Sequence, residues 1–170
     1  MSIDCVSPSG VSLWHHGIKG QKWGVRRTPE QLGHRALENK PIERVMIVNN
    51  TRTGETAEAY KSEKGFVVVA KKLTGYCLNP DSKHSNEFFR VGYSTEDAEL
   101  LFRDIEKGFD LSKKTGIRTT EDNEIRFTIL MDLGVTEKQE FLTSWQIGKN
   151  GEMPKLTSAY KHYTKREEHN

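Results

Sequence analysis

Residues 124–133, EIRFTILMDL, have the alternating pattern that decides the fold. Apolar side chains fill the odd positions and mostly polar ones the even positions, which is the period of a half-buried β-strand. Residues 139–147 and 155–160 have related patterns, and the GKNG sequence at 148–151 between them is a hairpin signal. These three segments predict an antiparallel β-meander.

The segment before this meander predicts a helix that packs on its odd-numbered face. Ser94 is suited to cap the helix, and Asp97 can reach back towards the first turn, close to a capping box. Residues 86–91 predict a further short helical turn, and residues 113–123 a charged loop. The apolar stripe assigned to the core is Ala98, Leu101, Phe102, Ile105 and Phe109. The predicted fold class is therefore α+β.

The N-terminal half predicts an extension with smaller elements. Thr28 and Pro29 are suited to begin a short helix that runs to about Glu38. Residues 41–72 contain β-branched segments bounded by glycine turns, which favour a small β unit, and residues 71–75 are expected to connect it to the next block. The expected organisation is a leader with a short helix in 1–40, the β unit in 41–72 and an α+β domain in 73–165.

Composition and charge limit the classes of function. The 170 residues include 26 Lys and Arg against 24 Asp and Glu, and the excess of basic residues lies in the first 75. A basic front half suits a nucleic acid or an acidic protein as partner. The longest apolar run is too short to span a bilayer, the chain does not begin with a secretory pattern, and Cys5 and Cys77 fit no metal or redox spacing. We expect a cytoplasmic protein with no membrane partner and no cofactor.

Residues 14–27, WHHGIKGQKWGVRR, combine glycines, tryptophans and cations. Such a segment offers stacking surface and phosphate contacts, and the alternative is a flexible leader or packaging tag. It resembles a short leader of phage and prophage proteins of Gram-positive bacteria, which implies a mobile-element origin. The candidate nucleic-acid-binding residues are Lys19, Lys22, Trp23, Arg26 and Arg27, with Lys113 and Lys114 from the charged loop.

A polar turn at 78–86 places Lys83 beside His84. An imidazole exchanges protons near neutral pH, and a neighbouring ammonium can stabilise a developing anion. Both side chains can equally be solvated turn residues. The even-numbered face of the predicted sheet presents cations and hydroxyls, and it is either ordinary solvated surface or a binding floor. Its residues are Arg126, Thr128, Ser144, Gln146, Lys155 and Thr157.

Four motifs of the second half occur in a fixed order: KLTGYCLNP at 72–80, VGYS at 91–94, TSWQI at 143–147 and PKLTSAY at 154–160. Together they resemble a poorly characterised domain family found at the C-termini of prophage and toxin-like proteins. The order of helix and sheet is similar to that of the barnase, EndoU and RelE group of metal-independent ribonucleases. The resemblance implies that Lys83 and His84 match the family's basic turn, and that Thr143 and Ser158 match its strand hydroxyls. The stretch before the basic pair is shorter here than in that family.

Cleavage of RNA without a metal requires a base for the 2′-hydroxyl, an acid for the leaving 5′-oxygen, and cations or hydroxyls around the phosphate. His84 is the candidate base or acid, with Lys83 or Glu87 for the second proton transfer and Lys83 and Arg126 as charge stabilisers. The candidate hydroxyl donors are Thr143, Ser144, Thr157 and Ser158. The carboxylates Asp81, Asp104 and Asp132 fall on different predicted elements, which disfavours a metal-dependent nuclease.

Three functional hypotheses follow. The first is a ribonuclease-like counter-defence protein of a mobile element, such as a type II anti-CRISPR protein that acts on guide RNA. The second is a non-catalytic protein, either a steric inhibitor of a nucleic-acid-handling complex or a virion accessory protein. The third is a toxin fragment, which would arrest growth without any CRISPR effector present.

Overall fold

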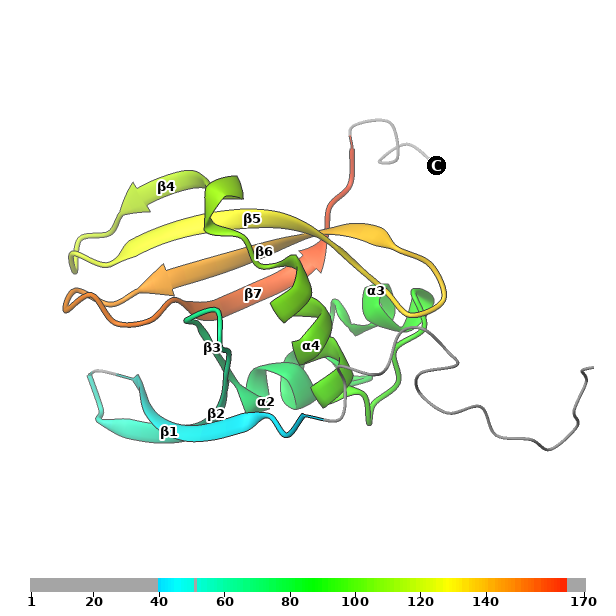
Figure 1. The fold of residues 1–170 in the computed structure, drawn as a ribbon, viewed down its shortest axis with the longest axis horizontal. Coiled ribbons are helices and arrows are strands. Elements are labelled where there is room, and N and C mark those ends of the chain that lie inside the picture. Colours follow the sequence, from blue (N-terminus) through cyan, green and yellow to red (C-terminus); the bar gives the residue numbers. More distant parts are fainter. Residues whose placement is uncertain (1–39, 51, 165–170) are drawn as a thin grey trace, which may run out of the picture. The chain divides into compact units, whose positions relative to one another are not determined.

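The computed structural model describes residues 40–50 and 52–164, which contain a seven-stranded sheet (Figure 1). Apart from Lys40, these residues belong to a compact unit that begins at Pro41. The strands lie in the order β1-β2-β3-β7-β6-β5-β4. Their bounds are β1 Glu43–Asn50, β2 Glu55–Lys61, β3 Val67–Val69, β4 Thr115–Thr119, β5 Ile125–Leu133, β6 Gln139–Ile147 and β7 Lys155–Lys161.

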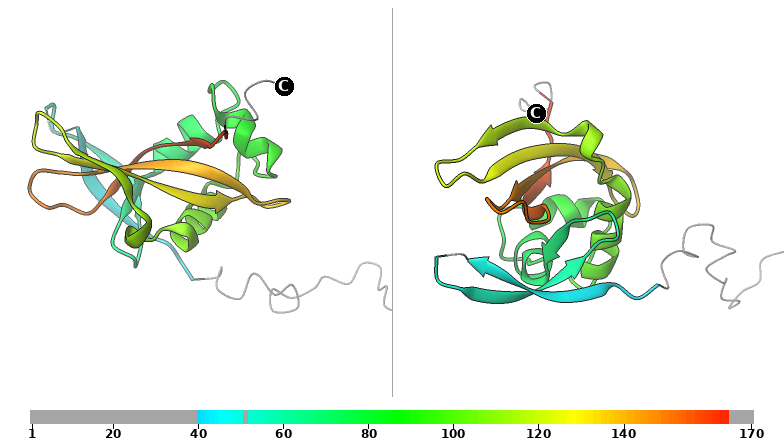
Figure 2. Two further views of the ribbon diagram at one scale, coloured as in Figure 1. Left: turned by 90° about the horizontal axis from the view of Figure 1, so that it is seen from above. Right: turned by 60° about the vertical axis from the view of Figure 1, so that its left-hand side comes forward.

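The sheet is weakly joined at its centre. All neighbouring strands pair antiparallel except β3 and β7, which run parallel and share one register pair, Val67 with Lys155. The backbone N–H of Val67 also donates to the carbonyl oxygen of Pro154 at 2.9 Å. The sheet therefore consists of a β1–β3 part and a β4–β7 part. Figure 2 shows that the two parts curl around the helices.

The main helix, α4 (Ala98–Gly108), forms where the apolar stripe predicts it. Leu101, Phe102 and Ile105 are buried against the sheet. At its start, the carboxylate of Asp97 accepts hydrogen bonds from the backbone N–H and the hydroxyl of Ser94, both at 2.7 Å. The other helical segments are short: α2 Ala70–Lys72, η3 Leu73–Cys77, α3 Ser85–Arg90 and η4 Leu111–Lys113.

The core lies between α4 and the odd-numbered face of β5 and β6. Trp145 is fully buried there, and its ring contacts Phe66 and Phe109 edge-on, with centroids 5.0 and 4.7 Å apart. Such aromatic pairs contribute about 0.5–1.5 kcal/mol each beyond the area that they bury. Because Phe66 lies at the start of the β3 segment and Trp145 on β6, these contacts join the two parts of the sheet.

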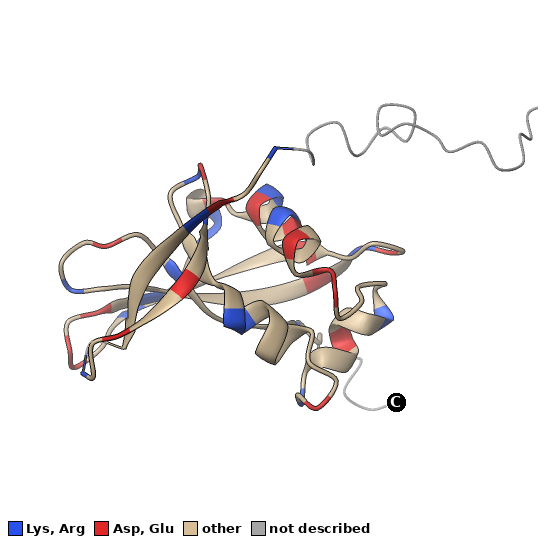
Figure 3. Ribbon diagram, turned by 90° about the horizontal axis from the view of Figure 1, so that it is seen from below, with Lys and Arg blue, Asp and Glu red and all other residues tan. Residues whose placement is uncertain are grey.

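Charged residues of both signs alternate along the solvent-facing side of α4 (Figure 3). Arg44 of β1 contacts Glu99 of this helix at 2.7 Å and Glu58 of β2 at 3.3 Å. Exposed ion pairs of this kind stabilise a fold by about 0–1 kcal/mol. Because positive and negative side chains are mixed on the solvent-facing side of α4, this side is poorly suited to bind a phosphate backbone.

The predicted α+β class and the three-stranded meander are confirmed. Two local predictions are wrong. The expected loop at 113–123 contains β4, and the expected connection at 71–75 is helical, with Leu73 fully buried. The strands of residues 41–72 share one sheet with those of 73–165, so these two segments are not separate units. The predicted leader and its short helix lie outside the described residues.

Candidate functional site

The outer face of β4–β7, opposite the core, aligns its side chains in rows across the strands. One row places Arg118, Arg126, Gln146 and Lys155 as successive cross-strand partners. Directly opposite side chains in antiparallel strands have Cβ atoms about 5 Å apart. We call these four residues the basic row. It brings together cations that lie far apart in the sequence.

A second row consists only of hydroxyl residues. Thr115, Thr128, Ser144 and Ser158 are successive cross-strand partners on β4, β5, β6 and β7. The hydroxyls of Thr115 and Thr128 lie 3.1 Å apart, whereas Ser144 and Ser158 are half-buried. We call this the hydroxyl row. Two of its members, Ser144 and Ser158, were predicted site residues.

Tyr160 continues the outer face of β7, opposite Leu142. Its ring centroid lies 5.8 Å from that of His84, which lies 6.1 Å from the ring of Tyr76. Lys72 Nζ sits 5.0 Å from the centre of the Tyr76 ring. Because α3 lies beside the end of β7 (Figures 1 and 2), the turn that carries His84 reaches this face.

Glu87 fixes the orientation of His84. Its Oε1 lies 3.2 Å from His84 Nδ1, and its Oε2 accepts a hydrogen bond of 2.6 Å from the backbone N–H of Lys161. The contact favours the tautomer with the proton on Nδ1, which leaves Nε2 as an acceptor. Among the described residues, the structure shows no hydrogen bond at His84 Nε2. The imidazole is therefore held in place with one nitrogen available.

Sequence reasoning missed a second histidine on the same face. His162 follows Tyr160 by two residues, and its backbone N–H donates to the carbonyl oxygen of Glu140 at 2.9 Å, so it extends the antiparallel ladder. Its Nδ1 lies 2.7 Å from Glu140 Oε2. The alternation of outward residues at 158, 160 and 162 was the signal that could have revealed it. We call Tyr76, His84, Glu87, Glu140, Tyr160 and His162 the histidine cluster.

The side chains of this cluster are accessible but partly shielded. His84 and His162 have side chains that are 27% and 35% exposed, and their carboxylate partners Glu87 and Glu140 are 15% and 48% exposed. Burial, followed by the effects of neighbouring groups, raises the pKa of Tyr76 above its ordinary value. Its phenol therefore stays protonated at neutral pH and can donate a hydrogen bond. Lys83 is an exposed neighbour of this cluster.

One predicted hydroxyl is not part of any surface site. Thr143 is fully buried; its hydroxyl donates to the carbonyl oxygen of Ile129 at 2.8 Å and accepts from Trp145 Nε1 at 2.9 Å. The prediction that Thr143 contacts a ligand is therefore wrong, because its side chain belongs to the core. Thr157 is half-buried at a bulge of β7, where its hydroxyl donates to the carbonyl oxygen of Ser144 at 3.0 Å.

Arg126 and His84, which were expected to converge on one phosphate, lie in different parts of this face. Arg126 is four residues along β5 from Leu130, whose row contains Tyr160. That offset is about 13 Å. Arg126 instead lies 3.7 Å from Glu124. The basic row and the histidine cluster are thus two parts of one face, with the hydroxyl row between them.

The remaining predicted nucleic-acid contacts lie beside this face or outside the described residues. Lys113 and Lys114 are exposed, and Lys113 lines a cavity of about 600 Å³ beside Asp104. This cavity is also lined by Thr115 of the hydroxyl row and Glu140 of the histidine cluster. The structure does not describe the leader candidates, namely Lys19, Lys22, Trp23, Arg26 and Arg27.

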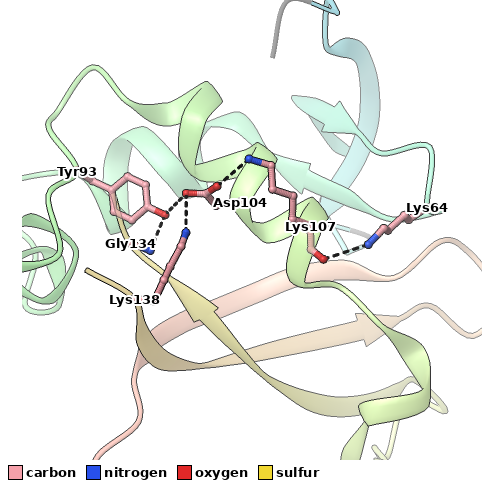
Figure 4. A network of polar contacts seen from close by, with 6 residues as sticks. All are labelled: Lys64, Tyr93, Asp104, Lys107, Gly134 and Lys138. Atoms are coloured by element: carbon pink, nitrogen blue, oxygen red, sulfur yellow. Dashed lines mark hydrogen bonds and ion pairs between the residues drawn. The ribbon is translucent and has the colours of Figure 1, made fainter. Parts of the chain in front are cut away.

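Asp104 is the centre of a buried polar network (Figure 4). Its carboxylate accepts a 2.6 Å hydrogen bond from Tyr93, and Lys107 and Lys138 lie 3.3 and 3.8 Å away. The Tyr93 hydroxyl in turn accepts from the backbone N–H of Gly134 at 3.1 Å, and burial raises the pKa of this tyrosine. The network fastens α4 to the turn between β5 and β6, which is a structural role.

Within residues 40–50 and 52–164, no group of three or more His, Cys, Asp or Glu side chains is placed to hold a metal ion. No helix in this described part of the chain combines the length and apolar character needed to span a membrane. Comparison with protein families, with curated proteins and with solved structures found no match.

Proposed function

We propose that this chain is a mobile-element protein that binds RNA on the outer face of β4–β7 and cleaves it at the histidine cluster without a metal. The observation that carries the proposal is the pair of imidazoles in the histidine cluster, each with its Nδ1 held by a glutamate. A base held by an orienting group is the usual arrangement for proton transfer.

The chemistry requires only groups of the chain and the RNA. One imidazole takes the proton of the ribose 2′-hydroxyl as the 2′-oxygen attacks phosphorus. The other imidazole gives a proton to the 5′-oxygen as its bond to phosphorus breaks, which yields a 2′,3′-cyclic phosphate and a 5′-hydroxyl. We assign the stabilisation of charge on the phosphate to Lys83, which precedes His84 in the sequence, and to the phenols of Tyr76 and Tyr160, whose rings lie 6.1 and 5.8 Å from that of His84.

The two rows support binding of the flanking nucleotides. The basic row supplies phosphate contacts, and the hydroxyl row supplies donors between that row and the histidine cluster. As target we propose the guide RNA of a CRISPR effector, because the motifs of residues 71–161 resemble those of prophage proteins. The protein would then be a counter-defence factor in the host cytoplasm.

A non-catalytic inhibitor is the second candidate. The observation that favours it is the offset of about 13 Å along the strands between the basic row and the row of Tyr160, which contacts His84. A protein that only blocks a ribonucleoprotein would bind through the basic row and would not require either imidazole.

The test uses labelled guide RNA, with and without its effector, in the presence of a chelator. We expect the wild type to cut the RNA, and His84→Ala and His162→Ala each to reduce the rate at least 100-fold, the usual contribution of general acid–base catalysis. Lys83→Ala should reduce it less, and Lys71→Ala, an exposed lysine on α2, serves as the matched control. Intact RNA with the wild type, while target cleavage by the effector is still blocked, would instead support the steric inhibitor.

A further inference from the structure

A cleft of about 820 Å³ opens where three hairpin tips meet at one end of the sheet, on the left in Figure 1. The tips are those of β1–β2, β4–β5 and β6–β7. Lys155 Nζ donates to the carbonyl oxygen of Asn49 at 3.2 Å, and Arg52 contacts Asp122 at 3.4 Å, so side chains join the first tip to the other strands. We call this the tip cleft. Its volume lies within the range of small-molecule sites.

The wall of the tip cleft is apolar on one side. Ile47, Val48 and Met153 line it, and Val48 and Met153 are 51% and 41% exposed. Exposed aliphatic side chains on one wall of a cleft can pack against the face of a flat ring. A planar aromatic ligand would cover this surface.

The polar lining of the tip cleft consists largely of amides and carboxylates. Asn123, Gln146 and Asn150 present both donors and acceptors, and Glu124 and Glu152 add acceptors. Side-chain amides bind the paired donor and acceptor of a base edge, and carboxylates accept from exocyclic amino groups. This set favours adenine, cytosine and guanine, which carry an amino group, over uracil, which does not.

Positively charged side chains also line the tip cleft or lie close to it. Lys149 and Lys155 line the tip cleft, and the two arginines nearby are each paired with a carboxylate, Arg52 with Asp122 and Arg126 with Glu124. Gln146 and Lys155 belong to both the basic row and the cleft lining. A phosphate backbone that follows the basic row would therefore lead one nucleotide into the cleft.

We infer that the tip cleft binds a single unstacked nucleotide that carries an amino-bearing base. The inference builds on the proposed RNA binding by the outer face, and it adds a site for base recognition separate from the histidine cluster. Proteins that recognise single-stranded RNA commonly separate a base from its neighbours in this way. The site would give the protein a preference for sequence at one position of the bound strand.

The test measures binding of AMP, CMP, GMP, UMP, adenosine and inorganic phosphate to the full chain by calorimetry and by amide chemical shifts. We expect the three amino-bearing nucleotides to shift amides of residues 148–153 and to bind about 10-fold more tightly than UMP, which is the effect of about one charged or paired hydrogen bond.

Two variants distinguish contacts to the base from contacts to the phosphate. Asn150→Ala should weaken AMP and adenosine alike by about 3-fold to 10-fold, because it removes a base contact. Lys149→Ala should weaken AMP by about 3-fold and leave adenosine unchanged, because it removes a phosphate contact. Lys71→Ala is the matched control and should change neither.

The outcomes distinguish this inference from the proposed function. RNA binding that depends on Arg126, with no binding of mononucleotides, would overturn the cleft inference and leave the function standing. Mononucleotide binding without RNA binding would overturn the proposed function and leave the cleft inference standing. Equal binding of all four nucleotides and of inorganic phosphate would reduce the site to an anion contact and overturn base recognition.

Discussion

Glu87 and Lys161 are joined by a 2.6 Å hydrogen bond from the backbone N–H of Lys161 to Glu87 Oε2. This bond fastens α3 to an edge of β7 where the described residues provide no neighbouring strand. The other oxygen of the same carboxylate holds His84. One side chain thus closes a strand edge and orients the imidazole that we assign to proton transfer.

Removing the Glu87 carboxylate should therefore affect stability as well as activity. We expect Glu87→Ala to lower the free energy of unfolding by about 1.5–3 kcal/mol, the range for hydrogen bonds to charged groups. Glu140→Ala removes the more exposed carboxylate of the other pair, and it should cost at most about 1 kcal/mol. Denaturant unfolding of both variants measures the difference, and equal losses would contradict the role given to Glu87.

The buried hydroxyl of Thr143 predicts a purely structural effect. Thr143→Val leaves Trp145 Nε1 and the carbonyl oxygen of Ile129 without their partner, so we expect a loss of about 1–3 kcal/mol in the free energy of unfolding. RNA cleavage per folded molecule should stay at the wild-type level. Thr119→Val, at an exposed position on β4, is the control and should change stability by less than about 0.5 kcal/mol. If folded Thr143→Val protein cleaved RNA much more slowly than the wild type, the Thr143 hydroxyl would have a role in cleavage and not only in stability.

The thiol of Cys77 predicts a dependence of stability on pH. Burial raises its pKa from 9.0 to about 12, so the folded state keeps the proton through a range in which the unfolded state releases it. The stabilising contribution is complete below about pH 9 and is lost as the pH rises from there towards 12. Between about pH 8 and pH 10, the free energy of unfolding of the wild type should fall by about 1.4 kcal/mol more than that of Cys77→Ala. Parallel pH profiles for the two proteins would show that the thiol does not contribute.

Gly134 should tolerate no side chain. Its φ is 143°, and an added Cβ would lie 1.8 Å from the carbonyl oxygen of Glu137. The same residue donates its N–H to Tyr93 in the Asp104 network. We expect Gly134→Ala to destabilise the fold by more than about 3 kcal/mol, because a backbone clash adds to conformational strain. Gly54→Ala has open space around its added Cβ, and its smaller loss would measure the positive φ alone. Thermal unfolding of the two variants makes the comparison.

The sequence predicted the elements whose periodicity is strong. β5, β6, β7 and α4 were recognisable because each alternates or repeats against a buried core. β4 was not, because all of its residues are exposed and its register shifts between Thr115 and Arg118. The sequence of residues 71–75 predicts a connection and not a helix, because the segment is too short to show a helical period.

The candidate site was predictable only in part, for physical reasons. The alternation of β5 and β6 placed Arg126 and Ser144 on the outer face, but sequence does not give the register that separates Arg126 from His84. His162 lies one residue beyond the end of β7, outside the strand that the pattern delimited. The tip cleft depends on three turns whose approach is determined by the curvature of the whole sheet.

The most direct test of the central claim is the chemical identity of the RNA ends after incubation with the purified protein in chelator. Transfer of protons by the two imidazoles predicts a 2′,3′-cyclic phosphate and a 5′-hydroxyl, formed by the wild type and lost in both His84→Ala and His162→Ala. Ends that carry a 5′-phosphate, or cleavage that persists in both variants, would contradict the account.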